Sequence, residues 1–251
     1  VGDQQASLFG AGCYEKNDIN CTMGTGTFLN INTGSQPVSA SKGIYPLVGW
    51  TISSNTTYML ECGLHDVGTV LSVAQNLVAL KKKQLFKYIC KLISSKCASV
   101  LESADQRNVN MSSLIGLKAQ TSKEHIVRAI LESLAFQVRL LLDTVENHYG
   151  TDTEMFRACG GIARNDFILQ LVSDLSRKII KRLKHNECSS LGAAFFAGLY
   201  CGIWKNINEI KAIQAKGDTF IPKFPSATKY EMQYLNWKKA VYHPIVTANS
   251  V

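Results

Sequence analysis

The feature that most constrains the fold of this chain is a pair of glycines set between a short strand and a helix. They are Gly160 and Gly161, in the stretch EMFRACGGIARNDFILQLVSDLS at residues 154–176. Glycines at such a turn let a ligand come close to the backbone, and the amide groups at the start of a helix favour a phosphate. Asn165, one turn into the predicted helix, can hydrogen-bond a base or a ribose. A plain strand-to-helix turn has the same pattern, so the motif alone leaves both interpretations open.

A second glycine motif predicts a hairpin near the start of the chain. In residues 19–34, INCTMGTGTFLNINTG, β-branched and aromatic residues stand on both sides of Gly24-Thr25-Gly26. This pattern predicts two short strands joined at that tripeptide, with a turn at Asn32-Thr33-Gly34. Backbone amides and the Thr25 hydroxyl at such a turn suit a polyphosphate. Tight turns use the same residues for purely structural reasons, so this motif is weak evidence by itself.

The rest of the chain alternates helices with short strands. The clearest helix, 121–150, has apolar residues at helical spacing, a capping box at Thr121 and Glu124, and Gly150 at its end. A helix rich in small residues, 189–204, is expected to lie flat on the sheet directly behind the diglycine turn. Further predicted elements are a hairpin around 53–55, helices at 66–80, 80–96 and 230–241, and a strand at 178–182. Hairpins followed by a helix–strand series predict a single α/β domain.

Composition and charge argue against two classes of partner. The chain has 251 residues, 46% of them hydrophobic, and no apolar run near the ~20 residues of a membrane span. Its net charge of +8 gathers in 80–96 and 176–185, without the interleaved aromatic residues of a nucleic-acid surface. We therefore expect neither a membrane span nor a nucleic-acid partner. The first residues resemble the interior of a domain and lack a leader pattern, so we expect a fragment.

The eight cysteines predict reduced thiols. They form no Cys-x-x-Cys pair and have no histidine partners at metal spacing. Several, such as Cys201 in GLYCGIW, lie in apolar runs, where cysteine behaves as a small buried hydrophobe. We therefore expect a cytoplasmic protein with no disulfide framework and no metal ligands of its own.

Five ordered blocks together resemble the FGGY carbohydrate kinases, most closely the glycerol kinases. They span residues 2–204 and read GDQQASLFG, GTGTFLNINTG, SLIGL with HIVRAILESLAFQ, GGIARNDFILQLVSDL, and LGAAFFAGLYCGIW. The resemblance implies an α/β fold of two ribonuclease-H-like, actin-like ATPase domains with a cleft between them. The whole chain, 1–251, is similar to the second domain, so the resemblance implies that the first, N-terminal domain is absent.

The resemblance also implies roles for single residues. Asp3 matches the catalytic base, which takes the proton from the substrate hydroxyl as that hydroxyl attacks the γ-phosphorus of ATP. Gln4 matches the amide that holds the polyol together with Asp3. The matches to nucleotide contacts are Thr25, Gly68, Ser72, Gly161 and Asn165. The implied cofactors are ATP and Mg²⁺, with much of the metal site in the first domain. Considered without the resemblance, Asp3 is an exposed residue that caps the helix QQASLF.

Three departures from the family pattern weaken the match. Ser72 stands where glycerol kinases usually carry a glutamine toward the nucleotide. Cys159 precedes the diglycine where an aspartate is common. The loop near 102–113 is shorter than in the family and lacks an Ala-Pro and an aspartate at the cleft mouth.

Two functions follow from these observations. The first is the C-terminal half of a glycerol-kinase-like enzyme, which transfers the ATP γ-phosphate to a polyol such as glycerol and is active only with its first domain. The alternative is a catalytically inactive nucleotide-binding or interaction module derived from that fold. The sequence leaves the polyol open, and also whether the chain forms a homo-oligomer.

Overall fold

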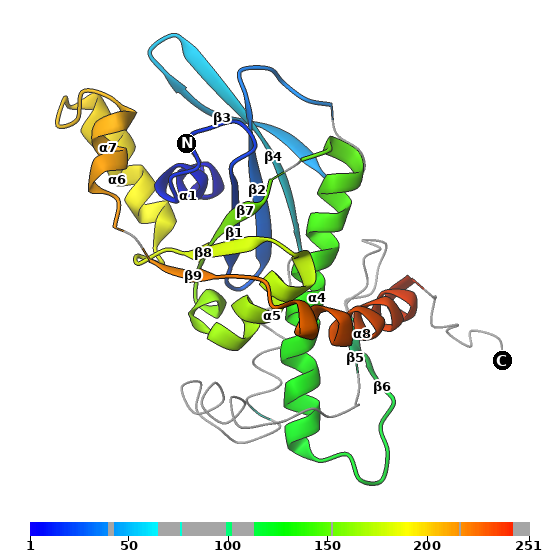
Figure 1. Cartoon of the computed structure of the whole chain (residues 1–251). Coiled ribbons are helices and arrows are strands. Elements are labelled where there is room, and N and C mark those ends of the chain that lie inside the picture. Colours follow the sequence, from blue (N-terminus) through cyan, green and yellow to red (C-terminus); the bar gives the residue numbers. More distant parts are fainter. Residues whose placement is uncertain are drawn as a thin grey trace.

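The computed structural model describes residues 1–39, 43–64, 99–101, 113–151, 153–215 and 217–242, together with position 76. Its centre is a seven-stranded sheet in the order β3-β4-β2-β1-β7-β8-β9 (Figure 1). β7 pairs in parallel with both β1 and β8, and the other neighbours are antiparallel. The strands are β1 (Ile19–Met23), β2 (Thr27–Gly34), β3 (Tyr45–Ile52), β4 (Asn55–Leu64), β7 (Met155–Cys159), β8 (Ile179–Arg182) and β9 (Asp218–Phe220). A separate antiparallel pair is formed by β5 (Ser99–Leu101) and β6 (Ser113–Ile115).

Both predicted hairpins are confirmed. β1 and β2 are joined through Gly24-Thr25-Gly26, with Met23 opposite Thr27. β3 and β4 meet at a two-residue turn, Ser53-Ser54, where Ser53 has a φ of +56°. β2 ends at Gly34, and the Asn32 side chain accepts a hydrogen bond from the Gly34 amide at 2.8 Å. The predicted turn at Gly24-Thr25-Gly26 is therefore confirmed, whereas the turn predicted at Asn32-Thr33-Gly34 is wrong, because these residues are the end of β2 and the turn follows them.

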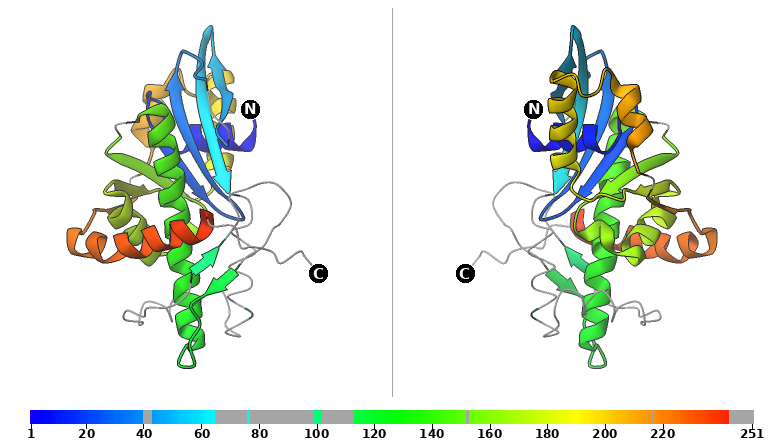
Figure 2. Two further views of the ribbon diagram at one scale, coloured as in Figure 1. Left: turned by 90° about the vertical axis from the view of Figure 1, so that its right-hand side faces the viewer. Right: turned by 90° about the vertical axis from the view of Figure 1, so that its left-hand side faces the viewer.

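One face of the sheet carries the larger apolar core. The helices α4 (Lys123–Tyr149) and α5 (Asp166–Ser176) lie on this face, and α8 (Phe224–Tyr242) packs outside them against both (Figures 1 and 2). Alternate residues of the central strands enter the core, as Ile19, Cys21 and Met23 of β1 do. This period of two is the reason that short strands with mixed polarity fold as a half-buried sheet.

The long helix begins slightly later than predicted. Its N-cap is Ser122, whose amide donates to Nδ1 of His125 at 3.0 Å, so the predicted capping box at Thr121 and Glu124 is wrong. Thr121 instead closes the preceding turn, because its hydroxyl accepts a hydrogen bond from the Lys118 amide at 2.9 Å. Gly150 ends the helix in the left-handed conformation, as expected.

The opposite face is covered by α1 (Asp3–Gly10), and α6 (Cys188–Tyr200) packs on α1 (Figures 1 and 2). The two helices approach closely, because a Cβ at Gly192 would lie 1.8 Å from the Ala6 carbonyl oxygen. The expectation that the 189–204 helix lies flat on the sheet is therefore wrong, since α1 lies between α6 and the sheet. α7 (Ile207–Ile213), which no sequence pattern predicted, follows α6.

The end of α6 also differs from the prediction. The helix stops at Tyr200, and Gly202, with a φ of +75°, turns the chain back so that the Trp204 ring covers Gly198. Cys201 is exposed as a result, which corrects the expectation of burial. The other cysteines in the described segments are buried, and all six described cysteines are free thiols.

Several expectations fall on residues outside those described. They are the helices at 66–80 (apart from position 76) and 80–96, the loop near 102–113, and the nucleotide candidates Gly68 and Ser72. Within the described segments, no helix has the length and apolarity that a bilayer crossing requires.

The α1–α6 contact predicts two unequal effects of adding a methyl group. We expect Gly192→Ala to lower the free energy of unfolding by at least ~1 kcal/mol, because the new Cβ meets the backbone of α1. Gly198→Ala meets only the ring of Trp204, a half-exposed side chain that can move, and is expected to cost less. Urea unfolding of both variants measures the difference, and equal costs would contradict this account of the contact.

Candidate functional site

Two glycine turns meet at one edge of the sheet. β1 and β7 are parallel neighbours with Thr22 opposite Cys159, so the segments that follow them leave the sheet side by side. Gly160 has a φ of +95°, and a Cβ on it would lie 2.5 Å from the Met23 carbonyl oxygen. Only glycine therefore lets the diglycine turn lie against the end of β1, from which Gly24-Thr25-Gly26 begins.

The second glycine of the pair has a different role. Gly161 is exposed, its φ of −64° suits any residue, and a Cβ on it would meet no atom within 4 Å. The surface above Gly161 is therefore open to a ligand. Thr25 is also exposed at this edge. The structure thus brings two of the predicted nucleotide contacts, Thr25 and Gly161, to the same edge of the sheet.

Asn165 does not lie one turn into the helix, as predicted, but caps it. The 3₁₀ turn η1 (Ile162–Arg164) comes first, and Asn165 Oδ1 then accepts hydrogen bonds from the amides of Phe167 (2.9 Å) and Ile168 (3.3 Å). Its side-chain nitrogen is buried and has no partner among the described residues. Asn165 therefore keeps one amide donor at the N-terminus of α5, where the helix dipole favours an anion.

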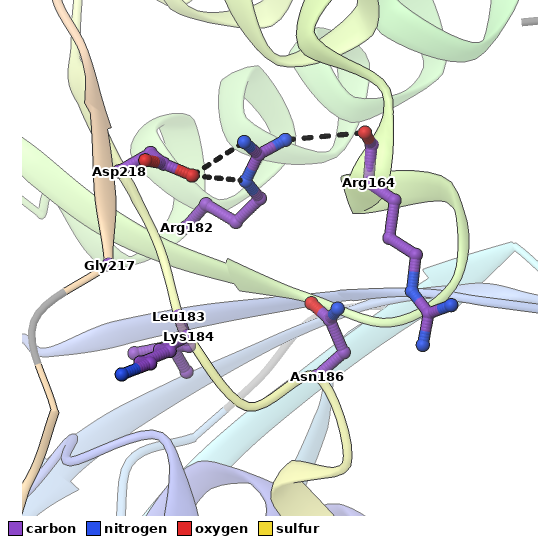
Figure 3. Close-up of a pocket in the computed structure, with 7 residues that line it drawn as sticks. All are labelled: Arg164, Arg182, Leu183, Lys184, Asn186, Gly217 and Asp218. Atoms are coloured by element: carbon purple, nitrogen blue, oxygen red, sulfur yellow. Dashed lines mark hydrogen bonds and ion pairs between the residues drawn. The ribbon is translucent and has the colours of Figure 1, made fainter.

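Arg182, at the end of β8, forms hydrogen bonds with η1, the turn that follows the diglycine. It donates to the carbonyl oxygens of Ala163 (3.4 Å) and Arg164 (3.3 Å) and pairs with Asp218 at 2.6 Å (Figure 3). Burial lowers the pKa of Arg182, but its hydrogen bonds to Asp218 and Asp166 raise that pKa by more. The guanidinium therefore stays charged. Arg164, Arg182 and Asp218 border a pocket of about 510 Å³ that Lys184 and Asn186 also line.

α1 holds the two candidate substrate residues. Asp3 is the first residue of α1 and is exposed. The N-cap of the helix is Gly2, so Asp3 is not the capping residue. Its carbonyl oxygen accepts a hydrogen bond from the Ser189 hydroxyl of α6 at 3.0 Å. Gln4 is half-buried, and its Oε1 accepts a hydrogen bond from the side chain of Asn30 on β2 at 2.8 Å.

A polar cluster fixes α1 over the ends of β1 and β7. The Ser7 hydroxyl of α1 lies 3.1 Å from the Thr22 hydroxyl and 3.8 Å from the Cys159 sulfur. A hydrogen bond with Cys188 lowers the pKa of the Cys159 thiol, against the opposing effect of burial. Cys159 is 1% exposed. The residue that replaces the expected aspartate therefore contacts α1 and does not line the open surface.

Comparison with known proteins identifies the domain. The family model for the C-terminal domain of the FGGY family of carbohydrate kinases matches residues 19–201. The chain belongs to this family. The FGGY chain is 38% identical to glycerol kinase 5 of Danio rerio over 238 residues, which cover 89% of the chain and 44% of that protein. It is 37% identical to glycerol kinase 5 of Homo sapiens, over 96% of the chain and 47% of that protein.

Solved structures support the same fold. A crystal structure of Plasmodium falciparum glycerol kinase with ADP superimposes with a TM-score of 0.85 and 27% identity, over 98% of the FGGY chain and 51% of that chain. Xylulose kinase from Rhodospirillum rubrum superimposes with a TM-score of 0.80 at 16% identity, over 96% and 50% of the two chains, which supports the fold alone. The FGGY chain thus has the actin-like kinase fold and spans about half the length of the curated relatives it matches.

Substitutions at the two glycines of the turn are expected to have unequal effects on stability. We expect Gly160→Ala to lower the free energy of unfolding by about 1–3 kcal/mol, because the new Cβ meets the Met23 backbone and the left-handed φ is strained. Gly161→Ala is expected to change it by less than ~0.5 kcal/mol, as at an ordinary surface position. Thermal and urea unfolding test the pair. A stable Gly160→Ala variant would mean that the two turns are not held together at this glycine.

Proposed function

We propose that this chain is the nucleotide-binding, C-terminal half of a cytoplasmic ATP-dependent glycerol kinase. The observation that carries the proposal is the meeting of the Gly24–Gly26 and Gly160–Gly161 turns on adjacent parallel strands. The edge where parallel strands end beside a helix N-terminus is where open α/β sheets bind ligands. Here that edge has turn amides and the N-terminus of α5, and the buried Nδ2 of Asn165 beside that N-terminus has no partner among the described residues. These groups suit the phosphates and the ribose of a nucleotide.

In this proposal the polyol lies at the start of α1. The Asp3 carboxylate accepts the proton of the attacking hydroxyl, and the Gln4 amide orients the polyol. General-base assistance contributes about 10²–10⁴-fold in rate. Most of the barrier to phosphoryl transfer is lowered by positioning and by neutralising charge. A first domain, which the additional length of the matched relatives can accommodate, supplies the other wall of the cleft in this proposal.

The described residues also fit ATP bound with Mg²⁺. The segments described contain no group of three His, Cys, Asp or Glu side chains that could hold a metal ion. Mg²⁺ in nucleotide sites usually keeps several waters and needs only one or two carboxylates beside the phosphates. Asp3 is an exposed carboxylate at the proposed site. The metal, when bound with ATP, would neutralise charge on the transferred phosphoryl group. In this proposal Asp3 keeps its role as proton acceptor, and much of the metal site lies in the first domain.

Nucleotide titration of the chain tests the nucleotide site. We expect calorimetry to detect ADP and a non-hydrolysable ATP analogue, the latter more tightly with Mg²⁺. We expect Gly161→Leu to weaken binding at least tenfold without loss of stability, because the side chain fills the open surface above the turn. Ser54→Leu, at the exposed β3–β4 turn, is the control and should bind normally. If both variants bind as the wild type does, the nucleotide lies elsewhere.

A second test concerns catalysis. We expect the isolated chain to show no glycerol-dependent ATP turnover, because one wall of the cleft is needed to clamp the second reactant. Co-expression with the first domain of a matched relative should restore turnover, and Asp3→Asn should abolish it at unchanged nucleotide affinity. Nucleotide binding without any restored turnover would favour the inactive binding module. Turnover by the chain alone that Asp3→Asn abolishes would overturn the need for the first domain.

A further inference from the structure

A fully buried amide lies beneath the first turn of α1. Asn30 is on β2, where its register neighbours are Asn20 on β1 and Glu61 on β4, and its exposed fraction is 0%. Cross-strand partners share a face of the sheet, so this polar row faces α1 and not the apolar core. From this row Asn30 Nδ2 reaches Gln4 and donates a hydrogen bond to Oε1 at 2.8 Å.

This contact determines which end of the Gln4 amide is left for a ligand. Gln4 Oε1 is occupied by Asn30, whereas Gln4 Nε2 has no partner among the described residues. Gln4 is half-buried, so its free end remains accessible. A carboxamide held in this way directs its oxygen toward Asn30 and its two N–H donors away from it. It therefore selects an oxygen acceptor, such as the oxygen of a polyol hydroxyl.

Packing alone does not require an amide at position 30. Asn30 Oδ1 is buried and has no hydrogen-bond partner within the described part of the chain. An unsatisfied buried acceptor costs free energy, and an apolar side chain of similar size avoids that cost. The next inward-facing residue on the strand, Asn32, differs: its Nδ2 donates to the Cys13 carbonyl (3.0 Å) and its Oδ1 accepts from the Gly34 amide (2.8 Å). Asn32 is thus satisfied at both ends, and Asn30 at one.

We propose that Asn30 is a positioning residue that locks the Gln4 carboxamide with its N–H donors toward the polyol. The role of Gln4 toward the polyol rests on the proposed function. The orientation of Gln4 does not, because it follows from the contact between two side chains of this chain.

The test is the side-chain ¹⁵N–¹H signal of Gln4 in the whole chain, assigned by its loss in Gln4→Glu. We expect Asn30→Leu to leave the melting temperature unchanged or raise it. The Gln4 signal should move to the position of a freely rotating glutamine and lose its steady-state nuclear Overhauser effect. The matched control, Asn32→Leu, should lower the melting temperature because it breaks two satisfied hydrogen bonds, and should leave the Gln4 signal in place.

A second variant covers the case in which Asn30→Leu perturbs the sheet. Asn30→Asp keeps the shape of the residue, but its carboxylate only accepts hydrogen bonds. Gln4 must then turn Nε2 toward residue 30, which shifts the signal and keeps it ordered. A Gln4 signal that is unchanged in both Asn30 variants overturns the proposal.

Glycerol titration separates this proposal from the proposed function. With the first domain of a matched relative co-expressed to supply the other wall of the cleft, glycerol should shift the wild-type Gln4 signal. Either Asn30 variant should then raise the dissociation constant for glycerol about 2- to 10-fold, the range of a single hydrogen bond. If glycerol leaves the wild-type signal unmoved, the polyol role of Gln4 fails. The spectra without glycerol still decide whether Asn30 orients Gln4.

Discussion

The parallel pairing of β1 with β7 is the constraint on which the candidate site depends. It brings together two turns that are more than 130 residues apart in sequence, because Thr22 is opposite Cys159, β1 ends at Met23, and β7 ends at Cys159 itself. Gly160 makes the pairing compatible with a turn, since any side chain there collides with Met23. This contact therefore holds the Gly24–Gly26 turn and the N-terminus of α5 at one edge of the sheet.

The two faces of the sheet have different roles: one contributes the apolar core that stabilises the fold, and the other orients α1. The face toward α4 and α5 is a continuous apolar core. The face toward α1 carries Asn20, Asn30 and Thr22, which form specific hydrogen bonds with α1 or with one another. Apolar contacts tolerate small shifts of a helix, whereas hydrogen bonds fix its position and rotation. The polar face is therefore the one that can hold a functional helix in register.

The sequence predicted the hairpins, the diglycine turn and the general order of helices and strands, because each depends on local residues. It failed where distant segments decide the outcome. The capping box moved to Ser122 and His125 because Thr121 was already engaged by Lys118. The 189–204 helix was predicted to lie on the sheet because its small residues indicate close packing but do not indicate which element the helix packs against. The roles of Asn30 and Arg182 were missed, although an asparagine within an apolar strand is a signal for a specific contact.

The diglycine turn and Asp3, the proposed proton acceptor, are also linked through β8. Arg182, at the end of this strand, holds the carbonyl oxygens of η1, and the chain then leads directly into α6. α6 in turn contacts α1 through Gly192 and through the hydrogen bond from Ser189 to the Asp3 carbonyl. One continuous segment, β8 to α6, therefore contacts both η1, which follows the diglycine turn, and the first residue of α1. Two groups that act on one phosphoryl transfer need a fixed separation, and a shared strand is a physical means of keeping it.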